Sequence, residues 1–277
     1  MIELLAFDFM RRALLAAVLV GLAAPAVGTF IVQRRLSLLG DGIGHVALTG
    51  VALGFLTGTA PVLTAVVVSV LGAITIELVR ARGRTSGDVA LALLFYGGIA
   101  GGVLLIGLAP GGSNSTLTSY LFGSISSVTA LDLWVIAIMA VGVLAVVAVF
   151  GRELFVLCQD EEVAKASGLP VRFLSMLIAV TAALTVVIAM RVVGLLLVSA
   201  LMVVPVATSQ QLTKGFRATM TLAMALGVAA TVGGLGFAYY ADVAPGSAIV
   251  LIALAGFGVA LGVGRFVRRS RTQESAP

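Results

Sequence analysis

The chain has 277 residues, of which 60% are hydrophobic and only 10% are charged, and its mean hydropathy is +1.19. A soluble domain carries roughly 25% charged residues, so this composition excludes a soluble globular protein. The net charge of +5 does not indicate nucleic-acid binding, because the basic residues lie at the ends of apolar runs. The single cysteine, Cys158, excludes an intramolecular disulfide and a thiolate metal cluster within one chain.

The apolar residues recur in runs of about twenty, the helix length that crosses a hydrocarbon core of about 30 Å. They do not alternate in short segments, as the strands of a membrane β-barrel do. We therefore predict an all-α, polytopic integral membrane bundle that forms a single transmembrane domain over residues 1–277. Nine spans are expected, near 13–33, 43–58, 61–80, 88–108, 131–150, 172–190, 192–211, 217–239 and 247–265. The second span is short and rich in glycine, so it is either a full crossing or a re-entrant segment, and the count is eight or nine.

The basic residues predict the orientation of the chain. If the C-terminus lies in the cytoplasm, alternation of the spans places 14 of the 17 Lys and Arg residues on the cytoplasmic side. The other three are Arg11, Arg12 and Arg191. Cytoplasmic loops of membrane proteins are enriched in Lys and Arg, so we expect the N-terminus outside and the C-terminus inside.

Asp41 and His45, the only histidine, lie four residues apart in the short stretch before the second predicted span. Residues at i and i+4 lie on the same side of a helix, one turn apart. Carboxylate and imidazole both bind divalent cations near neutral pH. A polar pair beside membrane helices indicates a place where an ion passes, although Asp41 could instead cap the helix N-terminus. Two ligands are too few for zinc, so water, another helix or a second copy of the chain would have to supply the others.

Other polar residues have simpler interpretations. Glu77 lies three residues before Arg80, which favours a local ion pair over a place in a cation path. Arg191 and Asp242 fall in outer connections, where they could contact an external partner, although isolated charges there are usually solvated. Pro205, in the seventh predicted span, should bend that helix or interrupt its hydrogen bonding, and it is a candidate marker of a transport pathway.

Two Thr-x-x-Asp patterns precede apolar runs, one formed by Thr85 and Asp88 and the other by Thr129 and Asp132. Both are typical of capping boxes, with Asp in place of Glu, so they predict helix starts. Glycines also recur at intervals of four, which predicts close packing of helices within one bundle rather than a dedicated dimer motif. These glycines are Gly50, Gly54 and Gly58, Gly97 and Gly101, Gly98 and Gly102, and Gly258 and Gly262.

The largest predicted inner connection, residues 151–171, contains a short charged segment. Acidic residues from Asp160 onward begin it, small and apolar residues alternate through it, and Gly168-Leu169-Pro170 ends it. This pattern predicts a short helix with a glycine cap and a proline stop. Such an exposed cytoplasmic helix could dock into the groove of a partner, or it could be an ordinary amphipathic connector.

The chain contains no ATP-binding P-loop. That motif requires a lysine after a glycine, whereas the two lysines, Lys165 and Lys214, follow Ala164 and Thr213. If transport is driven by ATP, the ATPase must therefore be a separate polypeptide.

Four blocks in order make the sequence resemble the permease subunits of zinc, manganese and iron ABC importers, the ZnuB-like family. Residues 34–45, RRLSLLGDGIGH, are similar to the family pattern R-x-L-x-L-x-G-D-A-x-S-H, with glycine at 42 and 44. Residues 120–125, YLFGSI, match its Y-L-F-G block, and residues 160–168 resemble its coupling helix. Residues 194–208, GLLLVSALMVVPVAT, are similar to its G-x-L-L-V-x-A-L-L-x-x-P-A-A-T.

The resemblance implies a multi-pass permease in the cell membrane that forms a homodimer and works with two copies of a separate ATPase. It also implies an extracytoplasmic metal-binding protein that delivers the cargo. By position, Asp41 and His45 would be transient ligands of a transported divalent metal, zinc before manganese or iron. The ATPase would be contacted by the coupling helix, with Asp160, Glu161, Glu162, Ala164, Ala166 and Gly168 as its matching residues.

Two other functions are possible. A secondary transporter driven by an ion gradient would need no ATPase, would leave the 160–168 segment without a purpose and would be expected to show internal repeats, and no convincing repeat is seen. An intramembrane serine hydrolase with His45 as its base would need a G-x-S-x-G elbow, which the sequence lacks. We therefore expect a transport subunit that is not itself an enzyme and has no permanently bound cofactor.

Overall fold

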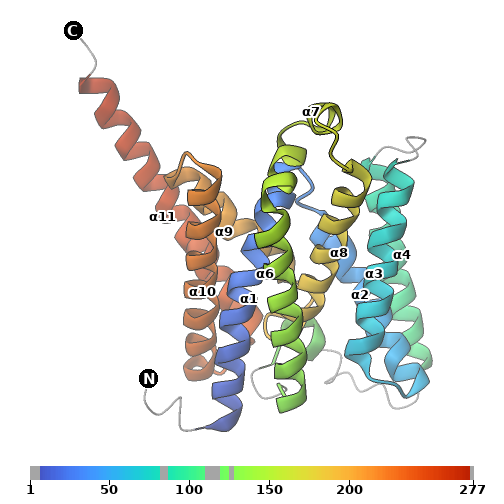
Figure 1. The fold of residues 1–277 in the computed structure, drawn as a ribbon. Helices are drawn as coiled ribbons and strands as arrows, with labels where there is room; N and C mark the ends of the chain where they lie inside the picture. The colour runs from blue at the N-terminus through green and yellow to red at the C-terminus, as the bar shows by residue number, and fades with distance from the viewer. Residues whose placement is uncertain (1–6, 82–86, 110–118, 125–127, 275–277) are drawn as a thin grey trace.

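The structure, a computed structural model, describes residues 7–81, 87–109, 119–124 and 128–274, apart from the side chains of 87–88 and 263–274. The regular elements in this part of the chain are helices that run side by side, with the short α7 at one end of the molecule (Figure 1). The all-α fold is therefore confirmed. The helices are α1 (Asp8–Gln33), α2 (Leu39–Thr57), α3 (Pro61–Ala81), α4 (Gly87–Leu108), α6 (Ala130–Gln159), α7 (Glu161–Ala166), α8 (Val171–Met190), α9 (Val198–Leu212), α10 (Phe216–Ala241) and α11 (Pro245–Glu274).

In the part of the chain that the structure describes, nine helices correspond to the nine predicted spans. In the described ranges, eight of them are long and apolar enough to cross a membrane, and α9 is a shorter apolar helix of 15 residues. The second span, α2, is one continuous helix of 19 residues that starts four residues earlier than predicted. Gly40, Gly42 and Gly44 therefore lie within a helix, and so do Asp41 and His45.

The predicted start of the seventh span at residue 192 is wrong. Residues 191–197 form turns, and α9 begins only at Val198. The backbone N–H groups of Leu195 and Leu196 donate to the carbonyls of Tyr120 and Leu121, at 2.9 and 3.2 Å. Gly194 adopts a φ of +87°, a conformation that side chains disfavour. The segment is apolar but pairs with 119–124, so its backbone is satisfied without a helix.

The predicted connection 151–171 is also partly wrong, because α6 continues through Arg152 and Glu153 to Gln159. Charged residues do not end a helix by themselves, and neither glycine nor proline stops the chain before Asp160. The non-helical part of this connection is therefore restricted to Asp160 and residues 167–170, on either side of α7.

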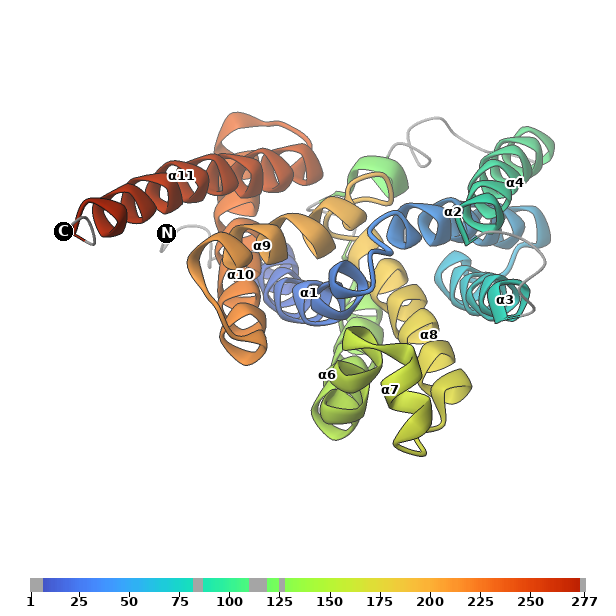
Figure 2. The same cartoon turned by 90° about the horizontal axis from the view of Figure 1, so that it is seen from above.

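The bundle has a buried centre and an exposed periphery. Within the apolar windows of α1 and α8, 72% of residues are buried, whereas the values for α3, α4 and α6 are 22, 17 and 22%. Figure 2 shows α1 in the middle of the molecule, with α9 and α10 on one side and α6 and α8 on another. In a membrane protein, the exposed apolar faces of the peripheral helices are available to lipid or to a second copy of the chain.

Candidate functional site

Asp41 lies in the first turn of α2, directly after the turn that joins α1 to α2. Its carboxylate does not cap the helix, because the N-cap residue is Leu38 and no side chain accepts a capping hydrogen bond there. Among the described residues, Asp41 has no hydrogen bond or ion pair. The capping role considered from the sequence is therefore not observed, and the partly exposed carboxylate is free to bind a cation.

His45 lies one turn further along α2, on the same side as Asp41. Its ring is partly buried, and the edge of the ring packs against Phe95 of α4 with centroids 4.4 Å apart. The Nδ1 atom is buried and has no hydrogen-bond partner in the described part of the chain. A buried ring nitrogen without a partner is costly, so this atom is suited to bind a ligand that the chain itself does not provide.

Gly98 of α4 fixes the position of the His45 backbone. A Cβ atom at residue 98 would lie 2.7 Å from the carbonyl carbon of His45, closer than real Cβ contacts. The Thr49 hydroxyl, one turn beyond His45, donates to the Gly98 carbonyl at 2.8 Å. The close helix packing predicted from the glycine spacing is confirmed here and for Gly50, Gly54, Gly101 and Gly102. It is wrong for four other glycines, where an added Cβ atom would meet no atom of the described residues within 4 Å: Gly58, Gly97, Gly258 and Gly262. The sequence did not reveal that the Gly98 contact supports His45.

Asp41 and His45 do not by themselves make up a full set of metal ligands. In the described ranges, no group of three or more His, Cys, Asp or Glu side chains could hold a metal ion. Manganese and zinc both require more than two ligands. Asp41 and His45 therefore fit a transient site, completed by water or by a second copy of the chain, rather than a permanently occupied one.

A charged cavity of about 340 Å³ lies beside the start of α2. It is lined by residues of the α1–α2 turn, including Arg34 and Leu39, and by Glu77 and Arg80 of α3. Glu77 and Arg80 form the predicted ion pair, at 3.3 Å, so their local interpretation is confirmed.

The short helix predicted near 160–168 is present as α7. The Asp160 side chain caps it by accepting N–H bonds from Glu162 and Val163, at 2.8 and 3.2 Å. Gly168 follows with a φ of +76°, and its N–H donates to the carbonyl of Lys165, as expected for a glycine that ends a helix. Glu161, Glu162 and Ala166 are exposed, whereas Ala164 is fully buried.

Arg34 connects α7 to the turn that precedes Asp41. Its guanidinium donates to the Ser175 hydroxyl of α8 at 2.9 Å and lies 3.4 Å from the Glu161 carboxylate. The Arg34 side chain is only 7% exposed, although Glu161 is 44% exposed. Arg34 therefore joins α7 and α8 to the end of α1.

Arg191, on the opposite side of the molecule from α7, is not the solvated charge expected from the sequence. Its side chain is 16% exposed, binds the Asp132 carboxylate at 2.9 Å and lies over the Tyr120 ring at 5.0 Å. Asp132 also forms the predicted capping box with Thr129. The Thr85–Asp88 box lies outside the described residues. Sequence reasoning missed this cluster because its members come from three separate segments.

Pro205 lies inside α9 and is buried, and the helix runs through it without ending. The Ser209 hydroxyl, one turn later, donates to the Pro205 carbonyl at 2.9 Å. A place for Pro205 in a transport pathway stays a prediction. Asp242 is exposed and ends α10 in a left-handed conformation, with a φ of +52°.

Comparisons with known proteins show the family of the chain. Residues 6–263 match the ABC 3 transport family. The chain is 34% identical over 257 residues to the manganese transport system membrane protein MntC of Listeria innocua, covering 93% of this chain and 91% of that protein. It is 36% identical over 245 residues to the manganese import system permease protein ScaB of Streptococcus gordonii, covering 88% of this chain and 87% of that protein. The fold is also similar to one chain in the structure of PsaBC from Streptococcus pneumoniae in complex with Fab, with a TM-score of 0.84 and 35% sequence identity. The match covers 94% of this chain and 95% of that chain.

Proposed function

Because the chain belongs to the ABC 3 transport family, we propose that it forms the membrane path of a manganese importer in which Asp41 and His45 bind the ion in transit. The chain is a multi-pass permease subunit of a metal ABC transporter, and the ATPase is a separate subunit. The observation that carries the proposal is that the Asp41 carboxylate, which does not cap the helix, and the unpartnered Nδ1 of His45 lie on one face of α2.

Manganese is proposed as the cargo on two grounds. MntC and ScaB, each at least 34% identical to this chain, are named for manganese. Carboxylate oxygen also suits manganese, while imidazole suits several transition metals. The sequence alone had favoured zinc, and that order is not confirmed. Zinc and iron remain the alternatives that a transport assay has to separate.

A homodimer would complete the site. Two copies of α2 that face each other across a dimer axis would bring together two carboxylates and two imidazoles. Such a set of four ligands is close to the coordination number that these metals require, with water supplying the rest. An ion held mainly by water and by side chains from two subunits is released when the subunits move apart, as a transporter requires.

We assign the coupling role to α7. In this proposal the exposed Glu161, Glu162 and Ala166, together with the Asp160 and Gly168 ends, meet the ATPase, one copy for each permease. The buried Ala164 anchors the helix to the bundle. Movement of α7 then passes through the Glu161–Arg34 ion pair to the turn before Asp41. An external metal-binding protein would deliver the ion to the opposite side of the membrane.

The proposal is tested by uptake of manganese, zinc and iron into cells that express this chain with a candidate ATPase and binding protein. We expect ATP-dependent accumulation of manganese, abolished by Asp41→Ala and by His45→Ala while the complex still assembles. Thr57→Ala, at the exposed far end of α2, is the matched control and should transport normally. Normal uptake by both site variants would show that the pair is structural, and accumulation of zinc or iron instead would reject manganese.

A further inference from the structure

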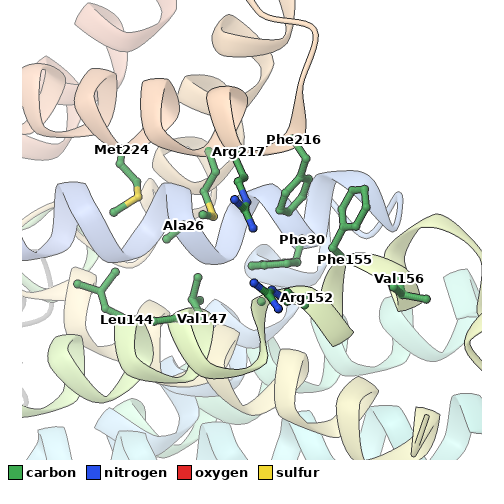
Figure 3. A pocket seen from close by; sticks show the side chains of 13 residues that line it. Ala26, Phe30, Leu144, Val147, Arg152, Phe155, Val156, Phe216, Arg217 and Met224 are labelled. Carbon is green, nitrogen blue, oxygen red and sulfur yellow. The ribbon is translucent and has the colours of Figure 1, made fainter. Parts of the chain in front are cut away.

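A groove of about 800 Å³ lies between α6 and α10, with α1 as its floor (Figure 3). Its walls are apolar over most of their length and include Phe30, Leu144, Val147 and Met224. Two arginines, Arg152 from α6 and Arg217 from α10, extend into the groove from opposite walls, between Met224 and Phe155. The volume is within the range of pockets that hold organic ligands, so the groove can hold part of a large amphiphile.

No acidic side chain in the groove neutralises the charge of the two arginines. No Asp or Glu is among the 13 residues that line it. In the described part of the chain, neither Arg152 nor Arg217 forms an ion pair, and both are exposed. Glu153, next to Arg152, does not line the groove. Two like charges that face each other from opposite walls favour an anion between them.

The position of Arg152 indicates the depth of this anion in the membrane. Leu131, Trp134, Ile138 and Val149 form an exposed apolar stripe along α6, each at least 69% exposed, and Arg152 lies on the same stripe one turn beyond Val149. At about 1.5 Å per residue, Arg152 lies about 32 Å from Leu131 along the helix, just beyond a hydrocarbon core of about 30 Å. Both arginines therefore lie at the level of lipid headgroups, on the side of α7.

The groove also lies away from the face proposed for the metal. His45 packs against α4, whereas the groove is formed by α1, α6 and α10. Seen from above, α4 and α6 lie on different edges of the molecule (Figure 2). A second copy that contributes to the Asp41–His45 site would leave this groove open to lipid.

We propose that the α6–α10 groove binds an anionic phospholipid, with its phosphate between Arg152 and Arg217 and an acyl chain along the apolar walls. The headgroup complements the two guanidinium groups, and the acyl chain packs against the apolar walls of the groove on α1 and α6. The binding depends only on the placement of the chain in a bilayer, so it is independent of the cargo and of the assignment of α7.

The test is native mass spectrometry of the detergent-solubilised full chain, titrated with dioleoylphosphatidylglycerol or with dioleoylphosphatidylcholine. We expect selective retention of phosphatidylglycerol. The double variant Arg152→Gln, Arg217→Gln should bind it about 25-fold more weakly, because each arginine near an anionic headgroup contributes about fivefold. The control double variant Arg12→Gln, Arg172→Gln removes the same charge from positions outside the groove and should bind as the wild type does.

A steric variant separates a lipid from a small anion. Ala148 is exposed and lines the groove, so Ala148→Trp should fill the path of the acyl chain and weaken phosphatidylglycerol binding while both arginines remain. Unchanged lipid affinity in Ala148→Trp would show that only the headgroup charge is recognised and would overturn the proposal. Equal retention of the two lipids by the wild type, or equal losses in the two double variants, would overturn it as well.

Discussion

Two largely buried arginines, Arg191 and Arg34, lie on opposite sides of this permease, and their ion pairs differ in length and exposure. Arg191 pairs with Asp132 at 2.9 Å, and the two side chains are 16 and 10% exposed. Arg34 pairs with Glu161 at 3.4 Å, and Glu161 is 44% exposed and also bound to Lys165 at 3.1 Å. The first pair is short, enclosed and supported by a capping box. The second is longer and partly exposed, and its carboxylate is shared with Lys165. The structure therefore combines a fixed junction on the side away from α7 with an adjustable one beneath α7.

The largest effect is expected from Arg191→Ala. Removal of one partner of an enclosed ion pair leaves the other charge without compensation, which typically costs about 3–5 kcal/mol. We expect a large loss of thermal stability of the purified permease–ATPase complex in detergent, with Arg191→Lys intermediate because it keeps the charge. A melting temperature equal to the wild type in Arg191→Ala would mean that this junction is not fixed by the ion pair.

A smaller effect is expected from Gly98→Ala. The added Cβ would meet the backbone of His45 and Val46 at 2.7 Å, so α2 and α4 must separate, at a cost of about 1–3 kcal/mol. Because His45 shifts with α2, the fractional loss of manganese uptake should exceed the fractional loss of folded complex. Gly97→Ala is the matched control, since a Cβ atom there would contact nothing within 4 Å. Equal uptake in the two variants would show that this helix contact does not position His45.

Arg34→Ala should affect stability less than Arg191→Ala, by about 1–3 kcal/mol, because it leaves one buried hydroxyl, Ser175, without its partner. Glu161 keeps its pair with Lys165. The distinctive result would be ATP hydrolysis that continues while manganese uptake per ATP falls. The matched control is Arg172→Ala, which removes an exposed cation at the start of α8. Parallel loss of hydrolysis and uptake would argue against a transmitting role for Arg34.

The smallest effect is expected from Glu161→Gln. The carboxylate is 44% exposed, and pairs of this kind contribute about 0–1 kcal/mol because solvent screens them. Stability should therefore be close to that of the wild type. Uptake should fall only modestly, since the amide oxygen of the substituted side chain can still accept a hydrogen bond from Arg34. A destabilisation as large as that of Arg191→Ala would remove the contrast between the two junctions.

The sequence predicted the features that depend on neighbours in the chain. The spans follow from apolar runs, the Thr129–Asp132 box from a spacing of three residues, and α7 from its acidic start and its glycine end. Long-range pairing was not predictable. Arg34 and Glu161 are 127 residues apart and Arg191 and Asp132 are 59 apart, so no local pattern connects them. The late start of α9 was missed for the same reason, because the N–H groups of Leu195 and Leu196 donate to the distant residues Tyr120 and Leu121.

The candidate site was also predicted only in part. Asp41 and His45 are close in sequence, so their spacing placed them on one helical face, and α2 has that geometry. The support from Gly98 and Phe95 comes from another helix and required the structure. That the pair binds a metal ion is a proposal based on the chemistry of the two side chains, and the choice of manganese is a proposal based on the relatives.

The most direct test of the central claim uses the fact that His45 is the only histidine in the chain. The permease is labelled with ¹⁵N-histidine, combined with unlabelled ATPase, loaded with Mn²⁺ and studied by electron–nuclear double resonance. We predict a ¹⁵N coupling to the manganese ion that is absent from a complex made with His45→Gln. Manganese bound to the labelled complex without any ¹⁵N coupling would contradict the assignment of His45 as a ligand of the transported ion.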